Sequence, residues 1–501
     1  MSSDRIFFFC LFSFLVGIGW GLLFGEHLLF FVLLLSVLGI AFWTAFRVKI
    51  VLAGFLFLAF FSFGALRSSH EMQFWQEEKS NVSREFSGEV RIIKEPVRKD
   101  FFRSIELRQE SCPKESCLSK SILWEAPLET KFSFGEKMSF SCSLKKAENF
   151  RPDFDYQMFL AKEGVLWICP SGTGTYSILP DTGKNFPSEN LFLLKRNFEH
   201  ALGKSFPEPE ASLAQGLLLG GGNRLPDTLR DAFSQIGLSH IVAVSGYNIT
   251  LVAELVLVLG ILFGIWRKQA LWVACLSILF FVLFVGAPAS AVRAGLMAGV
   301  GFVALQSGRL GRPFSLLLLA AALMLFLNPL LLLYDIGFQL SFLATLGILF
   351  GAPWFERVFP GDFFGKKILE IAWLTGIIEL FVVPLLLFHF QTFSWFSLFA
   401  NVLLLPLVPF AMMFSFGAGL LFFLLPGAHF LFSVPAYFLL TIITRFAEFF
   451  GSFSWVSITL FRPSILFLFV WYAFLIGIFL FFEEKQTRKW YANAFSFPAR
   501  R

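Results

Sequence analysis

Long apolar runs recur throughout this 501-residue chain and constrain its fold more than any motif does. A helix needs about 20 apolar residues to cross the hydrocarbon core of a bilayer. Three runs of that kind open the sequence, at residues 6–24, 27–46 and 50–66. About nine more begin near Ser239, Ala270, Ala289, Pro313, Asp335, Lys367, Phe396, His429 and Ser464. The pattern predicts a polytopic α-helical membrane protein of about 12 spans.

The composition excludes two other classes of protein. Hydrophobic residues make up 56% of the chain and charged residues 15%, whereas ordinary soluble proteins are roughly 25% charged. A soluble fold of this composition would leave large apolar patches in water. We therefore exclude a cytosolic enzyme and a disordered scaffold. The formal net charge of +6 lies mostly in short loops and the C-terminal tail, where the positive-inside rule accounts for it without nucleic acid.

One polar segment interrupts the apolar runs. Residues 67–185 carry 18 Lys/Arg and 18 Asp/Glu, so the segment is a solvated insertion with no net charge. Short runs of alternating polarity within it predict strands. These runs lie at residues 85–94, 101–108, 131–134, 138–144 and 165–169. Five or so strands in about 100 residues favour a small OB-like barrel, although a generic β-domain fits the same pattern.

Aromatic residues and cysteines give this insertion its candidate functions. Phe101, Phe102 and Trp124 are candidates to stack on bases, but the absence of net charge argues against a strong phosphate-binding surface. In an oxidising compartment four cysteines favour two disulfides, with three possible connectivities. A zinc site is the alternative, and it lacks both tight spacing and a nearby histidine. The four cysteines are Cys112, Cys117, Cys142 and Cys169.

The distribution of basic loops predicts the topology. If every span crosses once, the short Lys/Arg-rich loops fall on one side, which is then the cytoplasm. Both termini are predicted to be cytoplasmic and the barrel extracytoplasmic. The predicted organisation is an N-terminal three-span region, the barrel domain, amphipathic helices at the outer membrane surface, a transmembrane domain and a basic tail. Their boundaries are residues 1–66, 67–185, 186–236, 237–482 and 483–501.

Polar residues inside the predicted spans are the main functional candidates, because burying them in lipid is costly. Ser245 and Asn248 are three apart in the fourth span, with Gly246 between them. Arg293 lies about one turn inside the sixth span. There it contacts an anionic substrate, pairs with Asp335 or Glu254, or snorkels to the surface.

Two further spans carry polar residues of the same kind. Asp335 and Gln339 share a face of the eighth span, and Asn401 lies in an apolar stretch interrupted by prolines. That stretch, residues 396–424, is predicted to be one broken helix or a hairpin. The alternative for all these polar side chains is ordinary hydrogen bonding between helices. Arg445 and Glu448 are three apart and predict a mutual ion pair.

Motifs for metal or nucleotide chemistry are missing from the sequence. The six histidines are scattered, and neither an HExxH set nor a Walker A loop is present. We therefore expect no bound metal, no cofactor and no catalysis.

Four blocks of this sequence resemble the ComEC family of competence DNA-uptake channels. The first is LLLGGGNRLPDTLRDAFSQIGLSHIVAVSGYNITLVAE at residues 217–254. The others are PASAVRAGLM at 288–297, NPLLLLYDIGFQLSFLATLGIL at 328–349, and the region around Pro384, Asn401 and Pro406. The end of the polar insertion, RPDFDYQMFLAKEGV at 151–165, is similar to that family's OB-like outer domain.

The resemblance implies a channel that passes single-stranded DNA across the bacterial inner membrane during natural transformation. Ser245, Gly246 and Asn248 would then line or shape the path, with Arg293, Asp335, Gln339 and Asn401 nearby. Many relatives also carry a C-terminal metallo-β-lactamase-like domain, which we expect to be absent here. The expected partners are membrane lipid, an outer DNA receptor, a separate nuclease and a cytoplasmic helicase-like motor. The competing hypothesis is a small-solute or ion transporter with a broken-helix binding site.

Overall fold

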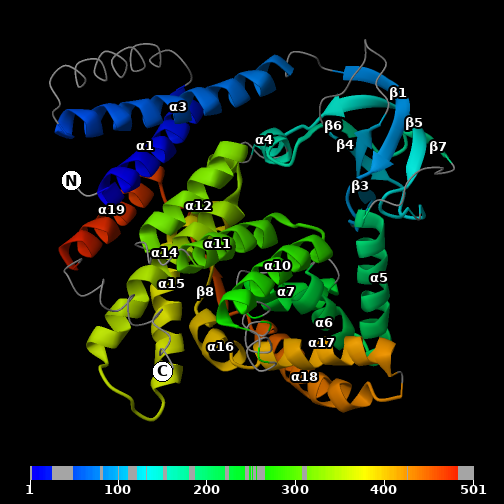
Figure 1. Ribbon diagram of the computed structural model, residues 1–501. Coiled ribbons are helices and arrows are strands. Elements are labelled where there is room, and N and C mark those ends of the chain that lie inside the picture. The colour runs from blue at the N-terminus through cyan, green and yellow to red at the C-terminus, as the bar shows by residue number, and fades with distance from the viewer. Residues whose placement is uncertain are drawn as a thin grey trace. The chain divides into compact units, whose positions relative to one another are not determined.

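The computed structural model describes most of the chain and divides it into two compact units (Figure 1). The first unit combines Met1–Phe192 with Leu318–Phe338, and the second combines Leu193–Leu317 with Gln339–Arg501. The described residues are 3–24, 49–78, 83–99, 101–110, 121–130, 132–149, 155–179, 187–220, 225–242, 248–249, 251, 256, 264, 266–306, 313–425 and 427–482.

A closed β-barrel forms one part of the first unit. Its strands are β1 (Ser83–Ile92), β2 (Val97–Arg98), β3 (Arg103–Gln109), β4 (Ser121–Ala126), β5 (Lys137–Lys146), β6 (Val165–Cys169) and β7 (Thr175–Ile178). β1 pairs antiparallel with β3 and with β5, while β6 pairs antiparallel with β5 and parallel with β4. The ring β1-β3-β4-β6-β5 is therefore complete. A five-stranded Greek-key barrel is the architecture of OB folds, and the predicted small β-barrel is confirmed.

Alternating burial builds the core of this barrel. Along β5, Met138, Phe140, Cys142 and Leu144 face inward and their neighbours face outward. They pack against aromatic rings from the facing strands, including the fully buried Trp124. Cys142 is bonded to Cys169 of β6 inside this core. One predicted disulfide is thus confirmed, while Cys112 and Cys117 lie outside the described residues.

The short helix α4 (Tyr156–Ala161) covers the outside of the barrel. Leu160 of α4 packs with Leu123 of β4 and Ile168 of β6 in a second apolar cluster. β4 is consequently buried on both of its faces. A strand buried on both faces shows no polar alternation.

Helices α1 (Ser3–Phe24) and α3 (Lys49–Glu78) form the remainder of the first unit's N-terminal part. Their backbones touch, because a Cβ at Gly17 would collide with the carbonyl of Phe61 and one at Gly64 with the carbonyl of Phe14. Small residues permit this close approach between apolar helices. Arg67 of α3 donates to the carbonyls of Phe326 and Leu327, at 3.1 and 3.2 Å. These carbonyls end α12 (Pro313–Leu327), where a cation is favourable.

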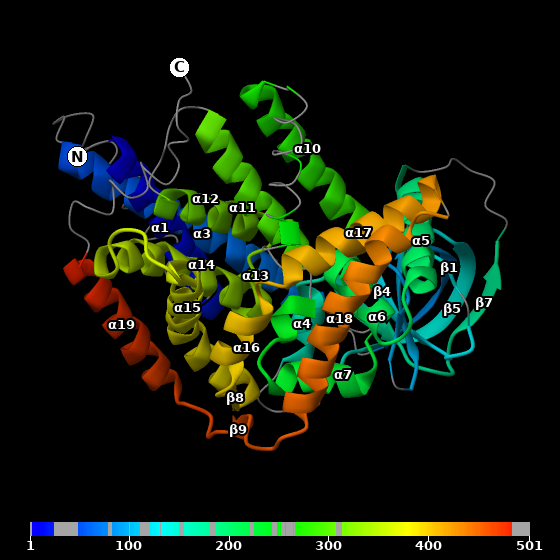
Figure 2. The ribbon, with the colours of Figure 1, turned by 90° about the horizontal axis from the view of Figure 1, so that it is seen from below.

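The second unit is a bundle of helices (Figure 2). Its helices are α5 (Pro187–Ser205), α6 (Glu210–Leu219), α7 (Asp227–Gln235), α8 (Ser239–Val242), α10 (Arg267–Val285), α11 (Ala289–Gln306), α12, α14 (Ile336–Val358), α15 (Lys366–Phe390), α16 (Ser397–Leu404), α17 (Val408–Leu424), α18 (Phe430–Gly451) and α19 (Ile465–Phe482). Three of them, α5, α12 and α14, begin or end in the first unit. Strands β8 (Thr392–Ser394) and β9 (Ser457–Thr459) pair antiparallel. α6, α7, α17 and α18 share one large apolar core.

Several of these helices are long and apolar enough to cross a membrane. Among the described residues, α14, α15 and α18 meet this condition singly, and α16 with α17 meets it as a pair bent by 49°. The pair confirms that residues 396–424 are interrupted, which fits a broken span or a re-entrant loop. The span predicted at residues 27–46 lies outside the described residues. Three or four spanning helices agree with a polytopic membrane protein, whereas the total of about 12 spans stays a prediction.

Helix α6 differs from the amphipathic surface helix that we expected. Nine of its ten residues are buried, including the acid Glu210 at its start. The core that buries them comes from α17 and α18 (Figure 2). The apolar spacing that suggested one lipid-facing stripe therefore belongs to a helix enclosed by protein.

Removal of the barrel disulfide should loosen this domain specifically. The bond joins residues 27 apart in sequence, and a crosslink of that span stabilises a fold by about 3 kcal/mol. We expect the Cys142→Ser/Cys169→Ser double variant of the full chain to be cleaved faster by protease within the barrel. Peptide mapping without reductant should find Cys142 linked to Cys169.

The matched control changes Cys10 and Cys275, the cysteines that are free among the described residues. This variant should keep the original cleavage pattern. A map that links Cys142 to any other cysteine would contradict the assignment.

Candidate nucleic-acid path

The turn after α4 makes polar contacts within the first unit. Asp155 caps the start of α4 by accepting from the backbone N–H of Met158, and Lys162 follows the last helical residue. The Lys162 ammonium lies 4.3 Å from the centre of the Phe159 ring. Gly164 then takes φ +79°, a conformation that favours glycine. This turn holds the Lys162 side chain away from water, with only 9% of it exposed.

Two residues of the predicted motif at 328–349 contact Lys162. The Asp335 Oδ1 atom lies 3.4 Å from the Lys162 ammonium, and Asn328 donates from Nδ2 to the Lys162 carbonyl at 2.7 Å. Asp335 also precedes α14 and accepts from the Phe338 backbone N–H at 3.2 Å. Asp335 therefore serves as both helix cap and ion-pair partner.

Two partners of Asp335 are described, Lys162 and the start of α14. Its place along the path and its possible pairing with Arg293 stay predictions. The exposed fractions of the two paired side chains are 9% and 7%. Loss of one partner of a buried ion pair leaves the other charge without compensation, which costs several kcal/mol. Lys162 was missed by sequence reasoning, because 173 residues separate it from its partner.

The outer surface of β3 is occupied by charged side chains of the barrel itself. Lys94 pairs with Glu106 of β3 at 2.6 Å and with Glu163 at 3.3 Å. Burial raises the pKa of the Glu106 carboxyl, and the Lys94 ammonium opposes this rise. Helix α4 covers the outer face of β4. OB folds bind oligonucleotides on the second and third strands of the barrel, which are β3 and β4 here. This surface is therefore largely covered.

The three stacking candidates differ in accessibility. Phe101 is 87% exposed and Phe102 is half-buried, both in the loop that leads into β3. The Lys99 ammonium lies 5.5 Å from the centre of the Phe102 ring. Trp124 is 1% exposed and packs against Phe140 in the barrel core. The prediction that Trp124 stacks on bases is therefore wrong, since neither face of its ring is free.

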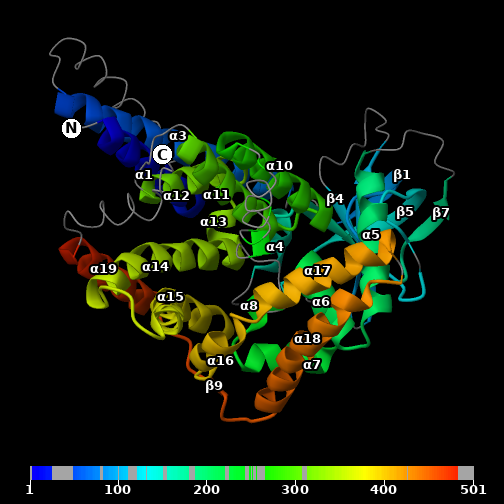
Figure 3. The same ribbon diagram turned by 60° about the horizontal axis from the view of Figure 1, so that its bottom comes forward.

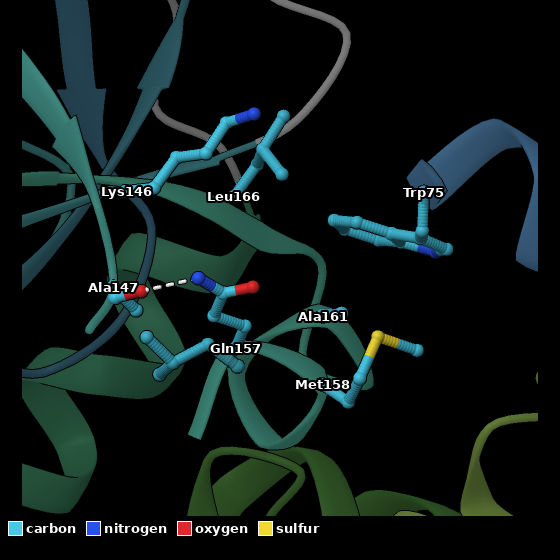
Figure 4. A pocket seen from close by; sticks show the side chains of 8 residues that line it. Trp75, Lys146, Ala147, Gln157, Met158, Ala161 and Leu166 are labelled. Atoms are coloured by element: carbon cyan, nitrogen blue, oxygen red, sulfur yellow. Dashed lines mark hydrogen bonds between the residues drawn. The ribbon is translucent and has the colours of Figure 1, made fainter. Parts of the chain in front are cut away.

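A small pocket lies beside α4, lined by Trp75, Met158 and Gln157 among others (Figure 4). Gln157 donates from Nε2 to the Ala147 carbonyl at 2.7 Å, which fixes its amide. The pocket has room for roughly one water molecule. It is too small for a nucleotide.

In the second unit, Asn248 is fixed by the end of a helix. It is 1% exposed and donates from Nδ2 to the Leu217 carbonyl of α6 at 3.0 Å. The last carbonyls of a helix lack partners within it, so this bond satisfies one of them. Ser245 and Gly246 lie outside the described residues. Asn248 therefore joins two parts of the predicted first motif.

The remaining path candidates are also buried or half-buried. Arg293 is 7% exposed and lies one turn inside α11, as predicted, and Gln339 is half-buried in α14. Asn401 is 6% exposed on α16. The Oδ1 atom of Asn401 is buried without a hydrogen-bond partner in the part of the chain that the structure describes. The predicted ion pair of Arg445 and Glu448 is confirmed at 3.4 Å.

Buried charges that sequence reasoning missed lie in the same unit. Lys195 of α5 donates to the Val285 carbonyl at 3.2 Å, at the end of α10. Glu210 accepts from the hydroxyls of Thr441 and Thr444, at 3.1 and 3.4 Å. Glu379 of α15 accepts from the hydroxyl of Ser397. The sequence did offer a signal for Glu379, because this residue is a single charge within a long apolar run.

Together these side chains place oxygen and nitrogen atoms inside apolar helices. Among the residues that the structure describes, no three His, Cys, Asp or Glu side chains gather as a metal site. The groups present can hydrogen-bond water or a polar solute that passes them.

The Lys162–Asp335 pair can be tested with a double-mutant cycle. Asp335→Asn keeps the cap of α14 and removes the charge, and Lys162→Met removes the opposite charge. Each single variant should lose about 3 kcal/mol or more, because one buried charge stays unpaired. The double variant should be less destabilised than the sum of the two, which thermal unfolding of the full chain in detergent would measure.

The control is the exposed Arg445–Glu448 pair, in which Arg445 is 77% exposed. Neutralising that pair should change stability by about 0–1 kcal/mol. Strict additivity of Lys162→Met and Asp335→Asn would refute the ion pair.

Comparison with known proteins agrees with this reading of the sequence. Residues 217–485 match the family model described as Competence protein. The chain is 26% identical over 274 residues to ComE operon protein 3 of Bacillus subtilis (strain 168), across 54% of this chain and 33% of that protein. The aligned segment thus spans about a third of the length of that curated relative. No solved structure matches the chain. Because the family model covers more than half of the sequence, this protein belongs to the competence protein family, as its resemblance to ComEC predicted.

Proposed function

We propose that this protein takes part in DNA uptake for competence and passes a single DNA strand through the bacterial inner membrane. The supporting observation is the coincidence of the family match, residues 217–485, with apolar helices that bury Asn248, Arg293 and Asn401. Polar side chains at membrane depth are costly and mark paths for polar solutes.

The charge of the substrate explains why a polar route is needed. Moving a charged phosphate from water into hydrocarbon, without water or an opposite charge beside it, costs several kcal/mol of free energy. Among the described residues, the buried cations of the second unit are Lys195 and Arg293, and Lys195 already donates to the end of α10. We therefore propose weak contacts along the strand, because a passage that binds phosphates tightly does not release them. Ser245, Gly246, Gln339 and Asn401 complete the proposed path.

The barrel is proposed to guide the incoming strand from outside. Its sheet surface is covered by α4 and by the Lys94 network, so contact would fall on the loop with Phe101 and Phe102. Exposed aromatic rings next to a lysine suit the bases and phosphates of a single strand. The disulfide between Cys142 and Cys169 supports an extracytoplasmic location.

The rest of the proposal follows from this orientation. Both termini would be cytoplasmic, and residues 67–185 would face outward between the N-terminal spans and the channel domain at 237–482. A DNA receptor would deliver the strand and a cytoplasmic helicase-like motor would pull it. The proposed function includes no catalytic step of this chain, so degradation of the other strand is assigned to a separate nuclease.

A transport function for small ions has one observation in its favour. The broken pair α16 and α17 bends by 49°, and discontinuous helices form ion sites in many transporters. The second candidate function is therefore an ion transporter with its site at this break.

Uptake of labelled DNA into the cytoplasm tests the proposed function. Deletion of the gene should abolish entry while capture of DNA on the cell surface continues. Asn248→Leu removes the bond to the Leu217 carbonyl, and Arg293→Ala removes a buried cation. Each should lower entry about tenfold or more, the effect of 1.4 kcal/mol on a barrier.

Arg445→Ala is the matched control, since that side chain is 77% exposed and should leave entry unchanged. Immunoblots of the membrane fraction confirm equal amounts of each variant. Normal entry in the deletion strain would refute a role in DNA uptake.

A further inference from the structure

Among the acids that the structure describes, Glu379 is unusual because it lies near the middle of a candidate membrane span. Its helix, α15, runs from Lys366 to Phe390 and is one of the three described helices that are singly long and apolar enough to cross a bilayer. Glu210, by contrast, begins α6, where the helix dipole favours a negative charge. Glu379 has no helix terminus to stabilise it. An ionisable group at such a depth points to function.

The described hydrogen-bond partner of Glu379 comes from the neighbouring helix α16. Ser397 of α16 donates its hydroxyl hydrogen to Glu379 Oε1. Asn401 lies one turn further along the same face of α16, and both side chains are buried, with 8% and 6% exposed. Asn401 Oδ1 is an acceptor without a donor among the described residues. α15 and α16 lie side by side over this contact (Figure 3).

The break in the neighbouring helix adds a second feature. α16 ends at Leu404, and the chain bends by 49° before α17. Pro406 lies in this bend, where its missing N–H and its ring interrupt a helix. Coupling-ion sites near the bilayer midplane are typically formed at such discontinuous helices.

No described positive charge compensates Glu379. α16 and β8, which pack against α15, contain no titratable or charged residue. α19 contributes Tyr472, whose hydroxyl donates to the Phe381 carbonyl at 2.9 Å. α14 approaches through Gly347 and Gly351.

The remaining charged groups lie toward the helix ends. Lys366, Lys367 and Glu370 begin α15, where Lys366 pairs with Glu356 of α14, and Arg357 ends α14. His389 ends α15, with Arg462 over the adjacent Phe388 ring. Glu379 therefore has a hydroxyl as its described partner and no described cation.

We propose that Glu379, Ser397 and Asn401 form an intramembrane proton-binding site. The Glu379 carboxylate takes up one proton and becomes a neutral carboxylic acid, and no other bond forms or breaks. Ser397 donates to one carboxyl oxygen, and Asn401 Oδ1 supplies the acceptor that the new O–H group requires. Uptake and release of this proton would accompany passage of the DNA strand. This coupling rests on the proposed function, whereas the proton-binding site does not depend on it.

Carbodiimide labelling tests the site without any transport measurement. Dicyclohexylcarbodiimide adds to a protonated carboxyl group in an apolar environment and leaves a stable N-acylurea. The full chain in liposomes is treated between pH 5.5 and 8.5, and the peptide that contains residue 379 is quantified by mass spectrometry. Labelling should fall about tenfold per pH unit on the alkaline side of its titration.

Three controls define the result. Glu379→Gln should lose the label, and Glu370 near the end of the same helix should stay unlabelled. Ser397→Ala removes a donor to the carboxylate and should move the labelling curve to higher pH. An unlabelled Glu379 at every pH would overturn the proposal. Suppression by sodium ions at constant pH would also overturn it, because the site would then bind a metal cation.

DNA entry separates the site from its proposed coupling. Glu379→Gln should lower entry of labelled DNA at least tenfold while surface capture stays normal. If the wild type is labelled with the expected pH dependence but Glu379→Gln imports DNA normally, the site stands and the coupling is refuted. If the deletion strain also imports normally, the proposed function fails independently of the labelling.

Discussion

The cost of burying polar groups among apolar helices determines where this protein places its hydrophilic side chains. The N–H and C=O groups at a helix end lack hydrogen-bond partners within the helix. A polar side chain placed there forms a hydrogen bond that satisfies both the side chain and the backbone group. Asp335 caps the start of α14, while Asn248 and Lys195 donate to carbonyls at the ends of α6 and α10. Helix ends therefore accommodate Asp335 and Asn248 from the family motifs and Lys195 from α5.

Glu379 and Asn401 are satisfied less completely. Glu379 lies inside α15, far from both helix ends, and its described partner is a serine hydroxyl. Asn401 lies in the last turn of α16, and its Oδ1 atom has no hydrogen-bond partner among the described residues. Such incomplete satisfaction is expensive in a purely structural role. It is reasonable for a site whose occupancy changes, because a proton or water can complete the set of hydrogen bonds. Asp335, by contrast, has both an ion-pair partner and a backbone N–H donor.

Local pattern predicted much of the fold and less of the site. Alternating polarity located β1, β3, β5 and β6, but β4 (SILWEA) was missed because the barrel core covers one of its faces and α4 the other. Apolar length located α14, α15 and α18. The expectation that α6 is amphipathic was wrong, because a short apolar stretch looks the same whether protein or lipid covers it. Partners far apart in sequence, such as Lys162 and Asp335, leave no local signal at all.

The scarcity of free cations bears on how a DNA strand would move. Lys162 and Lys195 are buried, yet each is engaged, the former by a carboxylate and the latter by a helix end. Withdrawing either from its partner to hold a phosphate would cost more than an exposed phosphate contact returns. Neither of these two lysines is therefore free to draw the polyanion inward. Under the proposed function, net movement would come from a force applied to the strand, and a protonatable group between α15 and α16 would let the membrane's proton gradient contribute to that force at the point where the helix is broken.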